Sequence, residues 1–592
     1  MKATQLTLFD RPATAEGERI RSAGDNGAGA EHGGSTRHQE LTSDERGAVF
    51  TRPEVVAFML DLAAYRADRD LAQLRVLEPA AGDGAFAVML VDRLVHSYLS
   101  HGGLPTEAFT KLRSCLVAVE VFDYSAAILS ARLAATAEGA GLPQAIARRL
   151  AQAWVVIGDF LLAEFADGFD LVVGNPPYVR QESIPAELLS AYRERFATLY
   201  NRADLYVLFF ERGLGLLRKG GKLVFICSDR WMKCAYGKPL RGLVARDFIL
   251  EVFVDMVGTK AFTSEVVAYP AITVISRNQQ ECSITLAAFQ PSLAPADLEA
   301  LAKGFAAGRP AKELGIRQLE SVAVGSAPWL IDARDTLRVV QSLEQRFPVL
   351  EAAGCKVGIG VATGCDRVFI GDFDKLDVEP ERKLKLVMAN CIRSGRLVWG
   401  GQGLVNPFEP DGTLAAPRRY PRFAAFLERH EEALRRRNVA KRSGEGWYRT
   451  IDRIWHHLPA TPKLLIPDIK GDPNVVIDRG EFYPHHNLYW VTSEEWGLEE
   501  LQAMLRSTVA KLFVATYCVK MANGFLRFQA QYIRRIRLPR WSAVTLAQRQ
   551  ALRDAVARLD QVAIDEAAFT VYGLDGASIV EVESFRNATT SP

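Results

Sequence analysis

The chain has 592 residues, 48% of them hydrophobic, and a formal net charge of +2. This length exceeds one ordinary hydrophobic core, so two or three domains are expected. No stretch approaches about 18 uninterrupted apolar residues, and the N-terminal region is polar, which argues against a membrane span and a secretory signal. We therefore expect a cytoplasmic protein with no membrane partner.

The first element is a polar tail, residues 1–40. It is rich in Gly, Ala, Ser and charged residues, a composition typical of disorder. One apolar segment interrupts it, Gln5-Leu6-Thr7-Leu8-Phe9. The segment resembles the short peptides by which bacterial DNA-processing proteins dock onto the replication sliding clamp, which predicts a clamp contact through Gln5, Leu6, Leu8 and Phe9. The alternative is that its apolar side chains pack back on the folded part of the chain.

Residues 41–280 form a second part, in which apolar strand patterns alternate with helical patterns. The helices are expected at 84–99, 126–138 and 204–217. The strands are expected at 75–77, 115–119, 154–157, 171–173, 222–227, 249–254 and 271–276. This alternation implies a doubly wound, parallel α/β sheet. Ligands bind such sheets outside the carboxyl ends of the strands.

The first strand leads into a glycine turn, Val76-Leu77-Glu78-Pro79-Ala80-Ala81-Gly82-Asp83-Gly84-Ala85-Phe86. Glycines at 82 and 84 allow the backbone to approach a ligand closely. The carboxylate of Glu78, at the strand tip, can accept a positively charged amino group. A plain tight connection is the alternative for this segment alone.

Two further strands end in an acid accompanied by a bulky ring. Glu120-Val121-Phe122 has the ring two residues after the acid, and in Asp159-Phe160 it follows at once. Such an arrangement suits an adenosine held by its ribose hydroxyls and base edge and covered by an aromatic surface. Each alone would more often be a helix cap, but three acidic strand tips in succession favour a ligand site.

Asn175-Pro176-Pro177-Tyr178 follows the next strand and indicates the reaction class. Two consecutive prolines fix a rigid loop that lacks backbone donors, which a plain turn rarely needs. The amino nitrogen of a base is a poor nucleophile because its lone pair is delocalised into the ring. The side-chain oxygen of Asn175 and the main-chain carbonyl of Pro176 can each accept one amino hydrogen, so that the nitrogen attacks a sulfonium methyl group. Tyr178 can stack on the reacting base once that base has left the duplex.

Residues 281–592 mix short strands, Gly-Pro turns and late helices, and they carry two basic stretches. The stretch 506–549 holds nine basic residues and no acidic one, interleaved with aromatic residues. The stretch 418–453 contains Arg418, Arg419, Arg422, Arg429, Arg435, Arg436, Arg437, Lys441, Arg442, Arg449 and Arg453. Two such stretches in one half of the chain favour a surface that binds DNA phosphates, although a solvated face is the alternative for each alone.

No metal site and no nuclease site are expected. The eight cysteines include no Cys-x-x-Cys pair and should be reduced thiols. The pairs His456-His457 and His485-His486 can be interpreted as metal ligands, but adjacent residues on a strand point apart, so contact with solvent or phosphate is preferred. Pro467-Asp468 resembles part of a nuclease strand, but no Glu-x-Lys or Asp-x-Lys motif follows it at a useful distance, so no nuclease site is assigned.

These motifs and their order resemble the gamma-class, Taq-like DNA adenine methyltransferases of bacterial restriction-modification systems. That family begins with a segment like Val49-Phe50-Thr51-Arg52-Pro53-Glu54, continues to Asn-Pro-Pro-Tyr, and places its target-recognition domain last. The resemblance implies a Rossmann-like methyltransferase sheet in residues 41–280 and a mixed α+β recognition domain with a helical C-terminal part in 281–592. It also implies S-adenosylmethionine as cofactor, base flipping in double-stranded DNA, methylation of the adenine 6-amino group, and a cognate restriction endonuclease.

The resemblance further implies the roles of single residues. Thr51 would touch the cofactor, Glu78 and Gly82 its methionine part, Glu120 its ribose, and Asp159 with Phe160 its adenine. Ala80, Gly84 and Val121 complete the expected cofactor site. The expected catalytic residues are Asn175, Pro176, Pro177, Tyr178 and Phe262, the last placed like the family's second aromatic residue on the flipped base. Arg52 departs from the family, which generally has proline after the threonine, and leaves the contact of Thr51 open.

Three other functions share parts of this pattern. Methyltransferases that act on a glutamine amide of a release factor carry the same Asn-Pro-Pro-Tyr. The long basic C-terminal half of this chain argues against such a protein substrate. A DNA-binding protein with an inactive catalytic domain is disfavoured by the presence of Glu78, Asp159 and Asn175. Cytosine amino methylation is the closest alternative, and Asn rather than Ser at position 175 favours adenine by family analogy.

Overall fold

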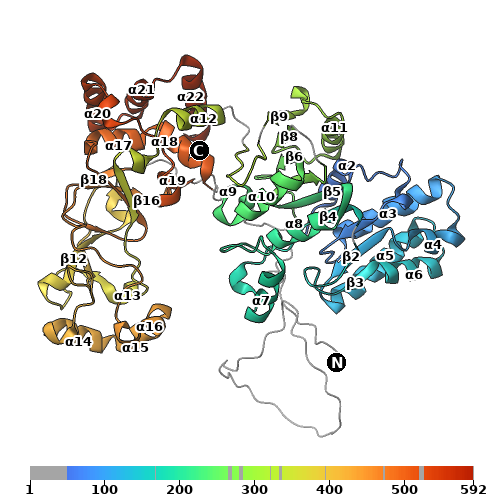
Figure 1. Cartoon of the computed structure of the whole chain (residues 1–592), viewed down its shortest axis with the longest axis horizontal. Helices are drawn as coiled ribbons and strands as arrows, with labels where there is room; N and C mark the ends of the chain where they lie inside the picture. Colours follow the sequence, from blue (N-terminus) through green and yellow to red (C-terminus); the bar gives the residue numbers. More distant parts are fainter. Residues whose placement is uncertain are drawn as a thin grey trace, which may run out of the picture. The chain divides into compact units, whose positions relative to one another are not determined.

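The computed structural model describes residues 50–166, 168–263, 270–278, 284–320, 322–331, 336–393, 395–470, 474–518 and 526–590. The chain divides into two compact units, Met1–Ala333 and Arg334–Pro592, which are described separately (Figure 1). The expected tail, with the clamp-like segment Gln5 to Phe9, lies outside the described residues. Within these ranges, no helix is both long and apolar enough to cross a membrane.

The first unit is built on a nine-stranded sheet with the strand order β3-β2-β1-β4-β5-β7-β6-β8-β9. The strands are β1 (Val76–Glu78), β2 (Leu116–Glu120), β3 (Val155–Ile157), β4 (Phe169–Gly174), β5 (Leu217–Ser228), β6 (Ile249–Asp255), β7 (Pro270–Ser276), β8 (Ile284–Phe289) and β9 (Arg317–Glu320). Neighbours from β3 to β5 are parallel. Every strand expected from the sequence is present, with its ends shifted by a few residues.

Strand direction differs from the expectation at one edge of this sheet. β7 is antiparallel to both β5 and β6, and β9 is antiparallel to β8. The α/β class is confirmed, but the expectation that every strand is parallel is wrong there. A parallel neighbour needs a crossover that is usually helical, whereas residues 256–263, the described part of the connection from β6 to β7, contain no helix.

Helices cover both faces of the sheet (Figure 1). They are α2 (Pro53–Leu62), α3 (Ala85–Ser100), α4 (Ala108–Leu112), α5 (Asp123–Gly139), α6 (Gln144–Trp154), α7 (Ala186–Arg195), α8 (Tyr206–Gly215), α9 (Arg230–Lys233), α10 (Lys238–Asp247) and α11 (Pro295–Ala306). Successive side chains of a strand point to opposite faces. Accordingly, Leu171 and Val173 pack in one core cluster with α2, α3 and α5, and Val172 packs in another with α7, α8 and α10. Burial on both faces explains the continuous apolar runs of these strands.

The first unit extends past residue 280, where the sequence placed its end. β8 pairs with β6, and β9 pairs with β8, so backbone hydrogen bonds carry the sheet to Glu320. Leu298, Leu301 and Phe305 of α11 belong to the core cluster that includes α2. The expected boundary is therefore too early, and the compact unit ends at Ala333.

The second unit contains two four-stranded sheets, in the orders β10-β20-β16-β18 and β11-β15-β12-β19. The first sheet consists of β10 (Cys355–Ile359), β20 (Leu488–Ser493), β16 (Lys463–Pro467) and β18 (Val476–Asp478). The second consists of β11 (Ile370–Asp372), β15 (Gln402–Val405), β12 (Lys383–Val387) and β19 (Tyr483–Pro484). Two short antiparallel pairs accompany them, β13 (Ile392–Arg393) with β14 (Arg396–Leu397) and β17 (Ile469–Lys470) with β21 (Leu526–Arg527).

Helices occupy the remainder of the second unit, consistent with the expected mixed α+β composition. In chain order, α13 (Asp366–Phe369) lies between β10 and β11, and α14 (Pro421–Arg429), α15 (Glu431–Arg435) and α16 (Asn438–Ser443) lie between β15 and β16. The others are α12 (Thr336–Arg346), α17 (Leu498–Arg506), α18 (Thr508–Tyr517), α19 (Ala530–Ile533), α20 (Leu546–Arg558), α21 (Gln561–Tyr572) and α22 (Gly576–Thr590). The late helices expected from the sequence are thus present.

Candidate active site

A cavity of about 260 Å³ in the first unit lies where β1, β2, β3 and β4 end. Its lining includes most residues singled out in the sequence: Thr51, Glu78, Ala80, Gly82, Glu120, Val121, Asp159, Phe160, Asn175 and Pro177. The other expected site residues, Gly84, Pro176, Tyr178 and Phe262, are not part of the lining. The three acidic strand tips and the residues after β4 therefore share one pocket, at the sheet edge where a ligand was expected.

The glycine turn follows β1 and contacts the end of β2 through Gly82. Gly82 and Gly84 have φ of +55° and +94°, a left-handed backbone conformation that residues other than glycine rarely adopt. A Cβ on Gly84 would also lie 2.7 Å from Cδ1 of Leu129. The backbone N–H of Gly82 donates to Oε2 of Glu120 over 2.9 Å, and that of Phe122 donates to Oε1 over 3.0 Å. These two donors fix the Glu120 carboxylate at the cavity wall.

Glu78 has one carboxyl oxygen without a hydrogen-bond partner in the described ranges, although a backbone hydrogen bond from Ala87 acts to lower its pKa. The residue is 1% exposed, and its Oε2 has no hydrogen-bond partner within the described part of the chain. Burial raises the pKa of Glu78 well above its usual range, and the nearby carboxyls of Glu120 and Asp83 raise it further. A buried acid of this kind suits a ligand that brings a positive charge.

Asp159 is held by a residue that the sequence analysis missed. The hydroxyl of Tyr192, on α7, donates to Oδ2 of Asp159 over 2.5 Å, and the backbone N–H of Leu161 donates to Oδ1 over 2.8 Å. Burial raises the pKa of Asp159, whereas the Tyr192 hydrogen bond acts to lower it. Tyr192 carried no signal, because nothing in the spacing of α7 indicates which strand tip it faces.

The aromatic partner of Asp159 also packs on a helix. The ring of Phe160 lies 5.1 Å from the ring of Phe209 on α8, measured between centroids, and both residues line the cavity. Phe209 is another lining residue that the sequence analysis missed, since its apolar position on a helix is typical of ordinary core packing.

Asn175 contacts Thr51 at the opposite end of the cavity. Nδ2 of Asn175 donates to Oγ1 of Thr51 over 3.3 Å. Thr51 itself forms an antiparallel bridge with Phe262. Arg52 strengthens this pairing, because its backbone N–H donates to the carbonyl of Ala261 over 3.1 Å and its Nε to that of Phe262 over 3.3 Å. Arginine at position 52 is thus compatible with Thr51 facing the cavity.

Two expected aromatic residues lie beside the cavity in packed positions. Tyr178 lies 6.4 Å from Tyr206 between ring centroids, and its hydroxyl is buried without a hydrogen-bond partner in the described residues. Burial raises the pKa of Tyr178 well above its usual range, so its hydroxyl stays protonated. Phe262 is 8% exposed and belongs to the core cluster of α2. A base that stacks on either ring would require these side chains to be uncovered.

The basic stretch 506–549 is neutralised in part. Three of its nine cations pair with acids distant in the sequence: Arg527 with Asp468, Arg534 with Glu351 and Arg537 with Glu344. Lys511 is only 4% exposed. These residues are therefore poor candidates for phosphate contacts, because the fold brings acids close to a stretch that contains none of its own.

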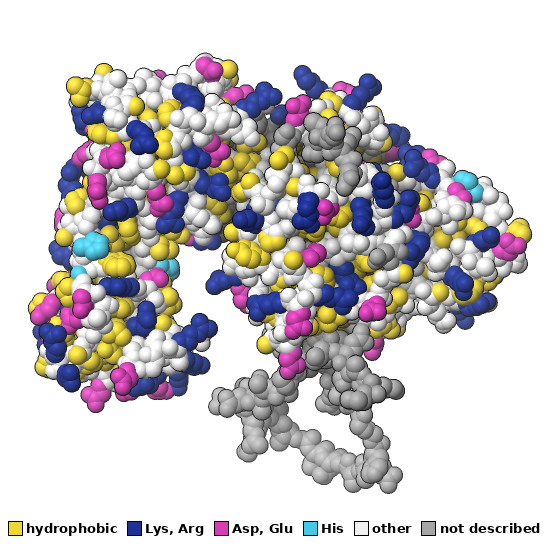
Figure 2. Space-filling view, in the orientation of Figure 1, with side chains coloured by type: hydrophobic (Ala, Val, Ile, Leu, Met, Phe, Trp, Pro, Cys, Tyr) yellow, Lys and Arg dark blue, Asp and Glu magenta, His cyan; other side chains and the backbone are white. Residues whose placement is uncertain are grey.

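The basic stretch 418–453 is also neutralised in part. Acids pair with Arg422, Arg429, Arg435 and Arg436. Figure 2 accordingly shows basic and acidic side chains interleaved over the α14–α16 part of the second unit. Three cations are exposed and form no ion pair with a described residue: Arg418, Lys441 and Arg442. These three are the best candidates for phosphate contacts.

The paired histidines differ from the expectation. The rings of His485 and His486 lie 4.0 Å apart between centroids and share a group with Asp366. They do not point apart as residues of one strand would, because they lie in the turn between β19 and β20. His456 instead contacts Asn406 and the carbonyl of Phe408.

Known proteins resemble the chain over most of its length. Residues 143–262, which include Asp159, Asn175 and Phe262, match the family described as Eco57I restriction-modification methylase. The type II methyltransferase M.XhoI of Xanthomonas vasicola is 49% identical over 536 residues, 90% of this chain and 98% of the relative. M.PaeR7I of Pseudomonas aeruginosa, also a type II methyltransferase, is 50% identical over 532 residues, covering 90% and 92%. Among solved structures, the type IIL restriction-modification enzyme MmeI in complex with DNA has a similar fold, with a TM-score of 0.58 at 12% identity, covering 91% of this chain and 77% of that one.

Proposed function

The chain belongs to the type II restriction-modification DNA methyltransferases, and from this premise we propose that it methylates the 6-amino group of adenine in duplex DNA, with S-adenosylmethionine as donor. The observation that carries the proposal is one cavity shared by Glu78, Glu120 and Asp159 with Asn175 and Pro177. Acids that suit a cationic nucleoside thus lie beside groups that suit a planar amino nitrogen.

The cavity residues fit S-adenosylmethionine. The buried, unpaired Oε2 of Glu78 suits the ammonium group of the methionine part. Glu120, fixed by two backbone donors, faces the place of the ribose, and Asp159 with Phe160 faces that of the adenine. When bound, the cofactor supplies an electrophilic methyl group on a sulfonium centre. The chain's residues orient this group and shield it from water.

Asn175 and Pro176 activate the target nitrogen in this proposal. Nδ2 of Asn175 donates to Thr51, so Oδ1, the other terminal atom of the amide, points away from Thr51. That oxygen accepts one amino hydrogen of the base, and the carbonyl of Pro176 accepts the other. The nitrogen then becomes tetrahedral, and its lone pair would bond to the methyl carbon as the methyl–sulfur bond breaks. The methylated nitrogen would afterwards release one of its hydrogens to solvent as a proton. Pro177 keeps the Pro176 carbonyl in place, since a proline fixes its own φ and restricts the residue before it.

Base flipping gives the aromatic residues a function. A base in a duplex cannot reach a pocket at a sheet edge, so it must rotate out of the stack. Tyr178, three residues after Asn175, and Phe262, which pairs with Thr51 in an antiparallel bridge, would then cover the base. Because the matching family model is described as a restriction-modification methylase, a cognate restriction endonuclease is part of the proposal.

Mass spectrometry of nucleosides tests the proposal. Duplex DNA treated with the full-length protein and S-adenosylmethionine should gain N6-methyladenine, and the Asn175→Ala protein should form far less. A product of N4-methylcytosine would overturn the assignment of the base. Methylation of a glutamine-containing protein substrate, with none of DNA, would overturn the assignment of the substrate.

The N-terminal segment Gln5 to Phe9 stays a prediction of sliding-clamp contact. A tethered enzyme would have a raised local concentration on newly replicated DNA. A peptide of residues 1–15 should bind a bacterial clamp at micromolar concentration and lose binding when Leu8 and Phe9 are both changed to Ala. Equal binding by the changed peptide would contradict the prediction.

A further inference from the structure

Asp366, His485 and His486 meet in the second unit where the chain passes between its two main sheets. Asp366 begins α13, on the connection from β10 to β11. The two histidines lie on the connection from β19 to β20. β10 and β20 belong to one sheet, and β11 and β19 to the other. Two connections between the sheets therefore come together at these three side chains.

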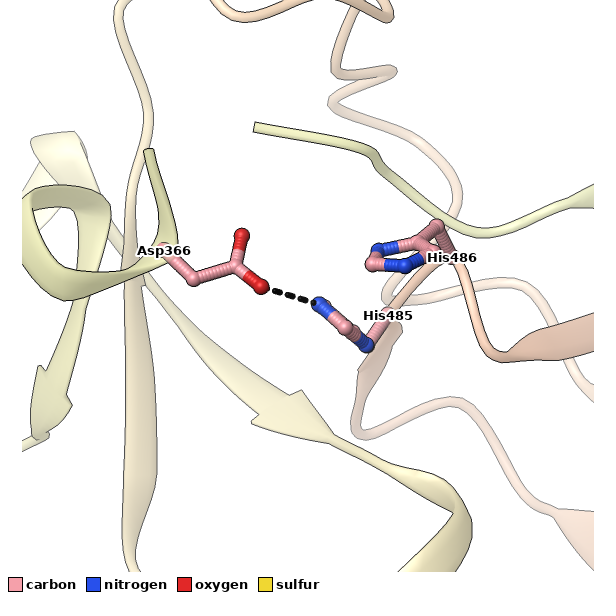
Figure 3. Close-up of side chains that lie close together, drawn as sticks. All are labelled: Asp366, His485 and His486. Atoms are coloured by element: carbon pink, nitrogen blue, oxygen red, sulfur yellow. Dashed lines mark hydrogen bonds and ion pairs between the residues drawn. The ribbon is translucent and has the colours of Figure 1, made fainter. Parts of the chain in front are cut away.

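Their donor atoms face one another. Figure 3 shows the carboxylate of Asp366 directed at the imidazole of His485, with the ring of His486 beside it. Oδ2 of Asp366 lies 3.1 Å from Nε2 of His485, and one ligand atom from each residue lies within 4.8 Å of the others. Ligands that surround one tetrahedral ion at about 2.0–2.2 Å lie roughly 3.3–3.6 Å apart. Binding would therefore draw the three donor atoms closer together, and the side chains of Asp366 and His486 are exposed.

The surrounding backbone fixes the cluster. The hydroxyl of Thr363 donates to Oδ1 of Asp366 over 2.5 Å, which orients the carboxylate. The backbone N–H groups of His485 and His486 donate to the carbonyls of Val387 and Val361 over 2.9 and 3.0 Å. The histidine backbone is therefore tied to both neighbouring segments before any ligand binds.

His485 is the buried member of the cluster. It is 3% exposed, and its Nε2, which faces Asp366, is the ring nitrogen placed to bind the ion. Two imidazoles and one carboxylate are ligands that zinc prefers, and they leave a fourth position for water.

We propose that Asp366, His485 and His486 bind one divalent transition-metal ion of the zinc class. The ion clamps the β10–β11 connection to the β19–β20 connection and so stabilises the second unit. All three ligands belong to the second unit. The inference does not rest on the proposed methyl transfer.

Metal titration of the full-length protein tests the site. Protein without an affinity tag is stripped with a chelator, dialysed, and titrated with ZnCl₂ by calorimetry, and then with CoCl₂ to record the visible absorption of the bound ion. One zinc should bind per chain. At a free zinc concentration about a hundredfold above Kd, the unfolding midpoint of the second unit should rise by about 5–10 °C.

Two variants assign the ligands. His486→Gln and Asp366→Asn change exposed side chains and should keep the native circular dichroism spectrum while losing zinc affinity at least tenfold, together with the rise in midpoint. His457→Gln, an exposed histidine of the other pair, should bind zinc like the unchanged protein. The proposal is overturned if the unchanged protein binds no zinc, or if both variants keep its affinity and its rise in midpoint.

Discussion

The hydrogen bond from Asn175 to Thr51 makes Thr51 a positioning residue for the proposed reaction. Thr51 is 4% exposed and lines the same cavity as Asn175. Thr51→Val removes the hydroxyl that accepts from Nδ2 and keeps the branched shape, so the side chain of Asn175 is no longer fixed in orientation by this hydrogen bond. We expect slower methyl transfer with nearly unchanged affinity for the cofactor.

The size of the effect follows from the bond. The distance of 3.3 Å and the neutral partners indicate a modest hydrogen bond. Such a bond contributes about 0.5–1.5 kcal/mol, which corresponds to a loss of roughly two- to twelvefold in kcat. Asn175→Ala removes the acceptor itself and should cost about 3 kcal/mol, or roughly a hundredfold or more. Because Thr51 acts through Asn175, the double variant should be no slower than Asn175→Ala alone.

Single-turnover methylation and calorimetry with the cofactor form the assay. If Thr51 instead binds the cofactor, as the family resemblance implies, Thr51→Val should raise the cofactor Kd, and its rate loss should add to that of Asn175→Ala. Either result would refute the positioning role. Thr263→Val is the matched control, because the Thr263 hydroxyl contacts the carbonyl of Phe50 in the same segment and lies outside the cavity lining.

Three further predictions concern the cavity and the second unit. The raised pKa of Glu78 keeps its carboxyl protonated to higher pH in the free protein, so binding a cation releases a proton. Cofactor affinity, measured by calorimetry, should therefore rise with pH above the ordinary carboxyl range. An equal rise in the Glu78→Gln protein would exclude Glu78 as the source of this pH dependence. Tyr192→Phe removes the donor to Asp159 and should weaken cofactor binding about two- to tenfold, whereas an unchanged Kd would leave Tyr192 without a role in the site. Alanine at Arg418, Lys441 and Arg442 should weaken DNA binding and reduce the slope of log affinity against log salt by about 0.9 for each phosphate that the protein no longer neutralises. Alanine at the ion-paired Arg534 and Arg537 should leave that slope unchanged, and the reverse ranking would contradict the assignment of the surface.

Local sequence was sufficient to predict the strands and the residues at their carboxyl ends. An apolar run followed by an acid or by Asn-Pro-Pro-Tyr places the polar residue at a strand tip, and parallel strands bring their tips to one edge. Glu78, Glu120, Asp159 and Asn175 share a cavity for this reason. Thr51 was found by family resemblance alone, since its position depends on the pairing of its segment with Phe262, far along the chain.

The features that sequence did not predict depend on contacts between distant segments. Tyr192 reaches Asp159 from a separate helix, and Glu344 and Glu351 neutralise arginines of a stretch that contains no acid of its own. The end of the first unit was placed too early because β8 adds to the sheet by pairing with β6, and no change of composition marks that event. Counting charges along a chain therefore predicts a surface only where the fold brings no acids close to it.

Several carboxyl groups gathered in the cavity together favour a cationic ligand. Glu78, Asp83, Glu120 and Asp159 all line it, and the carboxyls of Asp83 and Glu120 repel that of Glu78. Burial raises the pKa of both Glu78 and Asp159, and the repulsion from Glu120 and Asp83 raises that of Glu78 further. A ligand with an ammonium and a sulfonium group relieves this repulsion, whereas the product of methyl transfer has lost the sulfonium charge and relieves less of it. Under the proposed function, these carboxyls would therefore favour the methyl donor over its demethylated product, which would assist product release after each transfer.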